Sequence, residues 1–291
     1  FYSIGVDFGT NSVRALVVDT RNGNELASEV FPYPGGQDGV ITDRQDPNLA
    51  RQHPGDYVEG FLQTVRGAVA RAARRDRGFR PDRVAGLGID TTGSTPIPVN
   101  RQGVPLAMTP RFRRHPAAQA WLWKDHTAHA EAAEITALAR ERKEPYLAAC
   151  GGTYSSEWFW SKILHCQRTA PKVFEAAWSW VELCDFMPAY ASGQTDPLAL
   201  RRSVCAAGHK ALFNEAWGGL PSKAFLRALS PKLADLRDRL YHEAHASDQP
   251  AGRLAPGVAA RVGLPAGIPV AVGAFDAHHG AVGAGIRPGR L

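Results

Sequence analysis

The first hundred residues carry a pattern of three extended segments, one long helix and a fourth extended segment. Residues 4–19 begin and end in apolar runs with a short polar break between them, which predicts a β-hairpin. Residues 25–34 predict a third strand. Residues 53–75 place apolar side chains at helical spacing, and residues 83–99 contain another strand. The chain therefore opens with three antiparallel strands, followed by a helix that returns to a fourth strand.

A strand followed by a helix recurs at the other end of the chain, in residues 269–285. A short apolar run after Pro269 predicts a buried strand, residues 273–276 predict a turn, and the small residues that follow predict a helix packed against a neighbouring backbone. Asp276 then lies at the carboxyl end of a strand, where open α/β sheets bind ligands. An Asp in this position also commonly caps a helix, so both roles stay open.

Both ends together predict an α/β domain of the RNase-H-like or actin-like ATPase type. Its mixed sheet opens with three antiparallel strands, and helical insertions separate the fourth strand from residues 269–285. No Walker P-loop and no strand-linked GxGxxG fingerprint occurs in the sequence. The usual P-loop and Rossmann nucleotide sites are therefore excluded.

The polar break in the first hairpin has the composition of an anion site. Gly9 lets a backbone approach a ligand closely, and Thr10, Asn11 and Ser12 supply hydroxyl, amide and backbone donors. Asp7 directly precedes this turn, where it can hold Mg²⁺ through water. Polar hairpin turns also occur without any ligand, so this composition alone does not decide between a phosphate site and a simple turn.

Composition limits the class of protein and its partners. Of 291 residues, 44% are hydrophobic and 21% charged, which is enough for a globular core. No apolar run approaches the roughly 20 residues of a membrane helix, and no leader opens the chain, so we expect a cytoplasmic protein without a membrane partner. The densest basic run consists of Arg71, Arg74, Arg75, Arg77, Arg80 and Arg83. It is not interleaved with aromatic residues, which favours a solvated helix face and no nucleic-acid partner.

Three segments in fixed order resemble a known family. DFGTNSVR (7–14), IDTTGSTP (89–96) and GAFDAHHGAVGAG (273–285) are similar to the sugar-binding amino-terminal domain of the FGGY carbohydrate kinases. Intervening segments such as WLWKDHT (121–127) and AGHKALFNEAWGGLP (207–221) resemble the members that phosphorylate L-ribulose in arabinose breakdown. The resemblance implies transfer of the γ-phosphoryl group of ATP to a pentulose, with Mg²⁺, to give L-ribulose 5-phosphate.

The same resemblance implies roles for individual residues. Asp276 matches the catalytic base that takes a proton from the sugar hydroxyl. The residues that match the phosphate-binding hairpin are Gly9, Thr10, Asn11 and Ser12, with Asp7 as the carboxylate on the magnesium side. The residues that match pentulose contacts are Gly93, Trp123, Lys210 and Asp276, with Asp125 as a neighbouring candidate.

The resemblance also implies a division of the chain. Residues 1–291 correspond to one sugar-binding domain, with a core of about 1–100 and 256–291 and insertions at about 101–255. A second, nucleotide-binding domain is expected beyond Leu291, so we expect little kinase activity from these residues alone. Contact with that domain and a homodimer are the expected protein partners. Two alternatives stay open: a kinase of D-ribulose or D-xylulose, and a sugar-binding module without catalysis.

Overall fold

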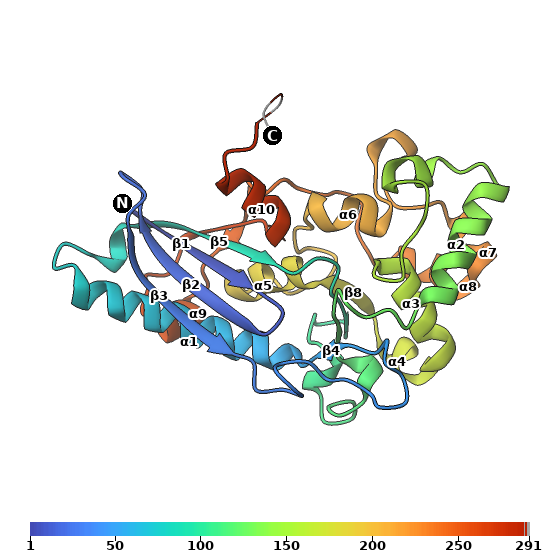
Figure 1. The fold of residues 1–291 in the computed structure, drawn as a ribbon, viewed down its shortest axis with the longest axis horizontal. Helices are drawn as coiled ribbons and strands as arrows, with labels where there is room; N and C mark the ends of the chain where they lie inside the picture. The colour runs from blue at the N-terminus through green and yellow to red at the C-terminus, as the bar shows by residue number, and fades with distance from the viewer. Residues whose placement is uncertain (288, 290–291) are drawn as a thin grey trace.

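A mixed β-sheet, here called the central sheet, lies in the left half of the molecule as drawn in Figure 1. The computed structural model describes residues 1–287 and 289. The strands of the central sheet are β1 (Tyr2–Phe8), β2 (Ser12–Asp19), β3 (Glu25–Pro32), β5 (Val84–Thr91), β9 (Pro250–Arg253), β10 (Pro269–Ala271) and β11 (Ala274–Phe275). Their order is β3-β2-β1-β5-β10-β9, and β11 pairs with β5. The first three strands are antiparallel, whereas β5, β10 and β11 run parallel to β1 or to one another. The predicted hairpin, third strand and returning strand are thus confirmed.

One face of the sheet is apolar and covered by helices. Alternate residues of β1, namely Ile4, Val6 and Phe8, are buried, as expected for a strand with one face on the core. They share a hydrophobic core with side chains of three helices: α1 (Pro54–Arg75), α5 (Leu183–Ser192) and α9 (Pro256–Val262). Helix α1 begins at Pro54, whose fixed φ suits a first helical turn, after the cap residue His53.

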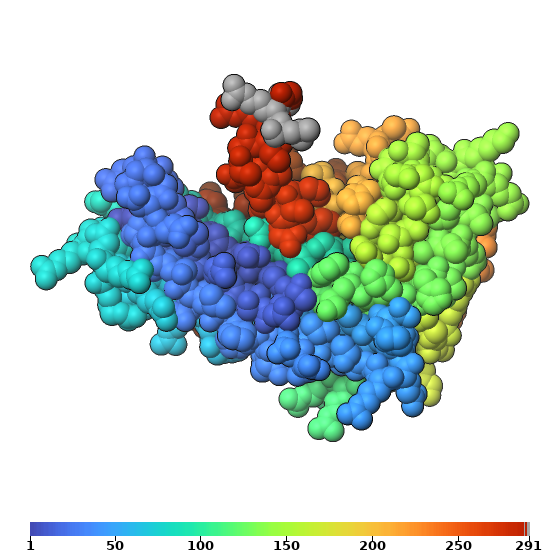
Figure 2. Space-filling model, in the orientation of Figure 1, coloured from blue at the N-terminus to red at the C-terminus, as the bar shows by residue number. Residues whose placement is uncertain are grey.

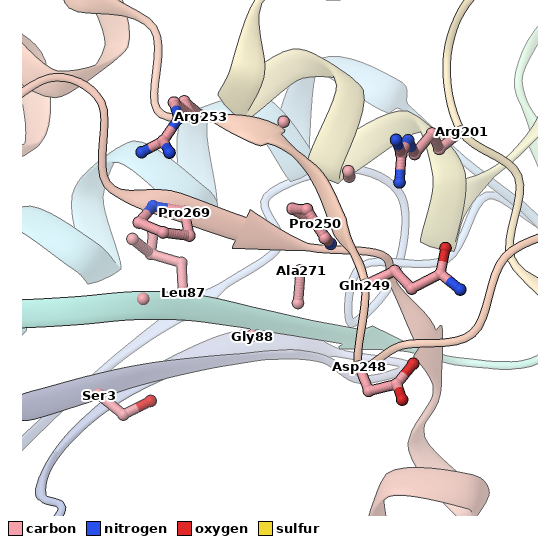
Figure 3. A pocket seen from close by; sticks show the side chains of 13 residues that line it. Ser3, Leu87, Gly88, Arg201, Asp248, Gln249, Pro250, Arg253, Pro269 and Ala271 are labelled. Atoms are coloured by element: carbon pink, nitrogen blue, oxygen red, sulfur yellow. The ribbon is translucent and has the colours of Figure 1, made fainter.

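The opposite face of the sheet is lined by small residues. In the pairing of β1 with β5, Ser3 lies beside Gly86, and Gly5 lies beside Gly88. Because the glycines present no side chain, a pocket of about 610 Å³ remains between this face and residues 248–253 (Figure 3). The predicted site residues do not line this pocket, and we assign it no function.

The chain between β5 and β9 folds largely around a second hydrophobic core (Figure 1, right). Its helices are α2 (His129–Glu141), α3 (Phe159–Thr169), α4 (Pro171–Ala176), α6 (Val204–Ala211), α7 (Lys223–Leu229) and α8 (Pro231–Arg237). Two small sheets connect it to the rest: β4 (Arg51–Gln52) with β7 (Ala120–Trp121), and β6 (Pro96–Val99) with β8 (Ser179–Glu182). Phe159 and Trp160 are buried here, as expected for core aromatics.

Two elements of the predicted 101–255 insertion belong with the central sheet and not with the second hydrophobic core. Helix α5 contributes to the core of the central sheet, and β9 forms one edge of that sheet. The division between core and insertion therefore stays a prediction, and these two elements belong spatially with the sheet. Among the described residues, no helix has the length and apolarity needed to cross a membrane.

The segment that ends the chain differs in two ways from its prediction. The predicted turn at 273–276 is wrong, because Ala274 and Phe275 form β11 and Asp276 begins α10 (Asp276–Gly283). Gly273 permits this path, since a Cβ atom there would overlap the carbonyl oxygen of Cys184. The predicted packing of α10 is also wrong within the described structure: none of its residues is buried. Figure 2 shows this segment standing up from the surface.

Candidate active site

Three carboxylates converge where parallel strands end. Asp7 of β1 lies beside Asp90 of β5, and Ala274 of β11 pairs with Asp90 from the other side. Asp276 follows two residues after Ala274, at the start of α10. Because parallel strands bring their carboxyl ends to one edge, residues distant in sequence meet here. The charges of Asp90 and Asp276 both act to raise the pKa of Asp7, as expected where carboxylates gather at one strand edge.

This crowding changes the acidity of Asp7. Partial desolvation is the largest cause and the charge of Asp90 is the next, and together they raise the pKa of Asp7 from 3.8 to about 6. Asp90 has its own neighbour in His279, whose Nδ1 atom lies 3.5 Å from Oδ2 of Asp90. The other oxygen of Asp90, Oδ1, is buried without a hydrogen-bond partner among the described residues. The site therefore carries concentrated, poorly compensated negative charge.

We expect Asp7→Asn to stabilise the protein at neutral pH. A raised pKa means that the folded state binds the proton more tightly than the unfolded chain, so the Asp7 contribution to stability falls as pH rises from about 4 to about 6. The unfolding midpoint of the variant in urea, measured with EDTA present, should exceed that of the wild type at pH 7.5. The difference should shrink towards pH 4.5. Asp235→Asn on α8 makes the same charge change outside the site and serves as the control. An equal gain in the unfolding midpoint of Asp7→Asn at both pH values would contradict the prediction.

The two neighbouring carboxylates fit a magnesium ion. The described residues contain no group of three or more His, Cys, Asp or Glu side chains that could form a complete metal site. Mg²⁺ at kinase sites, however, takes one or two carboxylates and completes its shell with phosphate oxygens and water. The unpartnered Oδ1 of Asp90 and the repulsion between Asp7 and Asp90 suit such an ion. A bound Mg²⁺ would neutralise charge on the phosphates of a nucleotide.

The hairpin turn beside Asp7 presents free backbone donors. The N–H groups of Thr10 and Asn11 find no acceptor within residues 1–287 and 289. The turn itself is fixed, because Nε2 of Gln52 donates to the Thr10 carbonyl at 2.7 Å and Nδ2 of Asn11 donates to the Asp38 carbonyl at 2.6 Å. A fixed turn with unpaired N–H groups can bind an anion such as a phosphate.

Trp123 reaches this turn from the insertion. Its Nε1–H donates to Oγ1 of Thr10 at 3.0 Å, and its ring stays 39% exposed. The structure therefore places a predicted pentulose contact directly against the predicted phosphate-binding turn.

Other predicted pentulose contacts surround the ring of Phe275. The Nζ atom of Lys210 lies 5.8 Å from the centre of this ring, and a Cβ atom built on Gly93 would lie 3.7 Å from its Cδ2 atom. On another side, Nζ of Lys210 lies 5.2 Å from the centre of the Trp158 ring. Within the described residues this ammonium group makes no hydrogen bond, and burial lowers its pKa. Lys210 is thus a partly desolvated donor beside the Phe275 ring, suited to a sugar hydroxyl.

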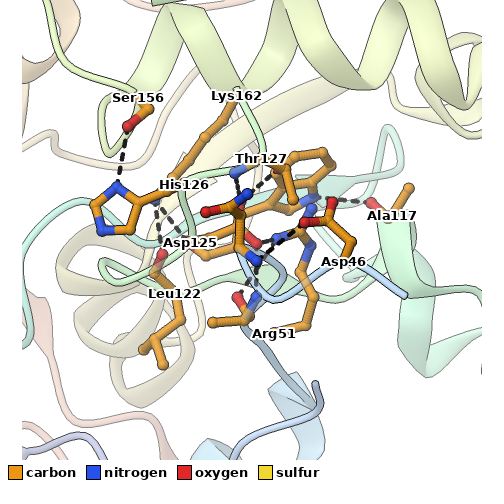
Figure 4. A network of polar contacts seen from close by, with 12 residues as sticks. Asp46, Arg51, Ala117, Leu122, Asp125, His126, Thr127, Ser156 and Lys162 are labelled. Carbon is orange, nitrogen blue, oxygen red and sulfur yellow. Dashed lines mark hydrogen bonds and ion pairs between the residues drawn. The ribbon is translucent and has the colours of Figure 1, made fainter. Parts of the chain in front are cut away.

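Asp125 belongs to a buried network of polar contacts with Arg51 and Thr127 (Figure 4). Its side chain is fully buried and forms an ion pair with Arg51. One carboxylate oxygen accepts from the Ala50 N–H at 2.7 Å, and the other accepts from Oγ1 of Thr127 at 2.6 Å. With its oxygens occupied in this way, Asp125 holds the loop that carries Trp123, and the structure does not bring it to the pentulose contacts.

Asp276 is not a helix cap. Phe275 occupies the N-cap position of α10 and makes no side-chain cap bond. Asp276 is the first helical residue, is exposed, and its Oδ1 accepts from the Ala277 N–H at 2.6 Å. A carboxylate in the first turn is stabilised by the helix dipole, and here one oxygen stays free to face a ligand.

A family model covers these same segments. The model described as the FGGY family of carbohydrate kinases, N-terminal domain, matches residues 2–283.

The chain belongs to the FGGY family of carbohydrate kinases.

Curated FGGY relatives agree with this assignment. A ribulokinase from Vibrio parahaemolyticus is 45% identical over 283 residues, which cover 97% of this chain and 49% of that protein. A ribulokinase from Shouchella clausii is 39% identical over 296 residues, which cover 100% of this chain and 51% of that protein. The chain thus spans about half the length of the curated relatives it matches.

Solved structures show the same FGGY kinase fold. Xylulose kinase from Rhodospirillum rubrum matches with a TM-score of 0.78 at 21% identity, over 99% of this chain and 52% of that chain. Glycerol kinase from Plasmodium falciparum matches with a TM-score of 0.74 at 13% identity, over 98% of this chain and 50% of that chain. The predicted actin-like ATPase class is confirmed by these likenesses, which at such identities concern the fold alone.

Several residues of this FGGY site were not predicted from the sequence. Asp90 follows an apolar strand just as Asp7 does, and that repeated pattern could have identified it. No local sequence pattern indicates that the Phe275 ring lies between predicted pentulose contacts. Its position depends on how α6 packs against β11. His279 also lies at the site, with its Nδ1 atom 3.5 Å from Oδ2 of Asp90.

Proposed function

We propose that the protein containing this chain transfers the γ-phosphoryl group of ATP to L-ribulose, giving L-ribulose 5-phosphate and ADP. The observation that carries the proposal is that Asp7, Asp90 and Asp276 lie where the parallel strands β1, β5 and β11 end, and that the turn at Thr10 directly follows β1. Lys210 and Gly93 lie around the ring of Phe275, the residue that precedes Asp276, and Trp123 binds the turn at Thr10, which supports sugar binding at the same edge of the sheet. The names of the ribulokinase relatives support the choice of ribulose, and the resemblance of segments such as 121–127 and 207–221 supports the L-form.

In this proposal Asp276 is the general base. Its exposed carboxylate would accept the proton of the sugar hydroxyl as that oxygen attacks the γ-phosphorus. Asp7 and Asp90 would hold Mg²⁺, and the N–H groups of Thr10 and Asn11 would bind phosphate oxygens. Phosphoryl transfer requires mainly positioning and charge neutralisation, which these groups supply without covalent chemistry.

Lys210 and Trp123 would recognise the pentulose. A partly buried ammonium group can donate to several sugar hydroxyls, each such bond contributing roughly 1.5–3 kcal/mol. Trp123 offers an exposed aromatic face at the edge of the same site. Because the chain spans about half of its relatives, we propose that a further domain supplies the adenosine pocket and contacts this one. Residues 1–291 alone would then turn over little or no substrate.

Two alternatives to L-ribulose phosphorylation differ in how the observations bear on them. Several structural neighbours are xylulose kinases, which keeps D-xylulose, and with it D-ribulose, as candidate substrates. A sugar-binding module without catalysis would retain Lys210 and Trp123 but would have no need of three carboxylates at one strand edge.

A panel of pentuloses in a coupled ATP assay tests the proposal. With the full-length protein, we expect the highest kcat/KM for L-ribulose, at a turnover of about 1–100 per second. Residues 1–291, assayed in parallel, should give no turnover above background. A higher kcat/KM for D-xylulose or D-ribulose would change the assigned substrate. Sugar binding without turnover of any pentulose by the full-length protein would favour the binding module.

A further inference from the structure

Lys162 is a buried cation beneath the site. It lies in α3 with none of its side chain exposed. Its Nζ atom donates to three backbone carbonyls: Ser94 at 2.8 Å, Leu122 at 2.8 Å and Trp121 at 3.2 Å (Figure 4). Three acceptors match the three N–H groups of an ammonium ion. The side chain is therefore fully satisfied, and it joins two segments that are distant in sequence.

These two segments carry predicted pentulose contacts. Ser94 directly follows Gly93, and Leu122 directly precedes Trp123. The first segment connects β5 to β6, whereas the second follows β7 in the insertion. Lys162 thus holds the two loops at a fixed distance from each other, although its own side chain is buried and does not reach the surface of the site.

The loop around Ser94 needs such support. Ser94 has a positive φ of 45°, a conformation that is rare for residues other than glycine. Its hydroxyl donates to Oε1 of the buried Glu182 at 3.3 Å, so this loop is held at both its carbonyl and its side chain. Burial raises the pKa of Glu182 to about 7, while the charge of Lys162 acts to lower it. Lys162 and Glu182 therefore form one buried polar group under the loop.

We propose that Lys162 is a positioning residue for sugar recognition, which sets the spacing between the Gly93 loop and the Trp123 loop. The proposal rests on the proposed sugar-kinase function. Loss of the ammonium group would leave three carbonyls unpaired and let the two loops move independently. Because both loops carry predicted pentulose contacts, the effect should fall on the affinity for the sugar.

The variant Lys162→Met in the full-length protein tests whether Lys162 positions the two loops for sugar recognition. We expect the KM for the pentulose to rise by about 10- to 100-fold, with kcat and the KM for ATP changing by less than about threefold. Leu226→Ala is the matched control, because it also damages the core of the insertion but touches neither loop. It should leave all three constants near their wild-type values.

Hydrogen exchange provides a second readout that needs no substrate. Amide exchange in residues 92–95 and 121–124 should accelerate together in Lys162→Met and stay unchanged in Leu226→Ala. If Lys162→Met does not fold, Lys162→Gln, which keeps an amide donor, takes its place in both measurements. Unchanged exchange in either loop, or a parallel loss of kcat and of affinity for both substrates, would overturn the proposal. A wild type without pentulose turnover would refute the proposed function but leave the exchange result intact.

Discussion

Replacing Asp276 by Asn in the full-length protein is expected to lower kcat by about 10²- to 10⁴-fold, the usual contribution of a general base. The amide is nearly the same size as the carboxylate but cannot take the proton of the attacking hydroxyl. Affinity for the pentulose should persist, because Lys210 and the Phe275 ring remain in place. Steady-state kinetics with L-ribulose gives kcat, and isothermal titration of the sugar without ATP gives its Kd.

Asp235→Asn serves as the control for this experiment. It removes one carboxylate from α8, in the insertion and outside the site, and should leave kcat unchanged. A turnover near the wild-type value in Asp276→Asn would refute the role of general base. A large loss of sugar affinity with unchanged kcat would instead make Asp276 a binding residue.

Asp125→Asn should lower the free energy of unfolding by about 3–5 kcal/mol, the usual result of breaking a buried ion pair from one side. The change leaves the guanidinium group of Arg51 fully buried without its counter-charge. The side chains of both partners are almost completely excluded from solvent, so water cannot compensate. Urea unfolding followed by circular dichroism measures the loss.

Two further variants make this test specific. Asp238→Asn breaks an exposed ion pair with Lys223 and should leave the unfolding midpoint nearly unchanged, since surface pairs contribute little. The double variant Arg51→Met with Asp125→Leu replaces both charges by apolar groups and should recover much of the loss. A direct sugar contact at Asp125 would instead appear as a raised pentulose KM with normal stability.

Local patterns in the sequence were sufficient for most of the central sheet. The alternating burial of β1 and the helical spacing of α1 each follow from the pattern of neighbouring residues, so periodicity predicted both. Asp7 and the turn at Thr10 also lie where the hairpin pattern placed them. Such features depend on interactions within a few residues, which a single sequence records directly.

Features that depend on tertiary contacts could not be predicted in this way. Asp125 resembles a site residue in sequence, but its burial with Arg51 results from the pairing of β4 with β7. The strand β11 is only two residues long and forms because β5 offers it a partner. The role of Lys162 likewise depends on two loops meeting beneath it, and a lysine in a helix gives no local sign of full burial.

The parallel pairing of β11 with β5 also has a consequence for how the protein folds. Asp90 and Ala274 lie on opposite sides of the insertion, so their pairing closes a very long chain loop. Contacts between residues so far apart in sequence form late, because the entropy cost of closing the loop must be met before the contact contributes any stabilisation. During synthesis the hairpin and the second core can fold first, while Asp276 has yet to leave the ribosome. The carboxylate cluster can therefore be completed only after the whole insertion has been synthesised.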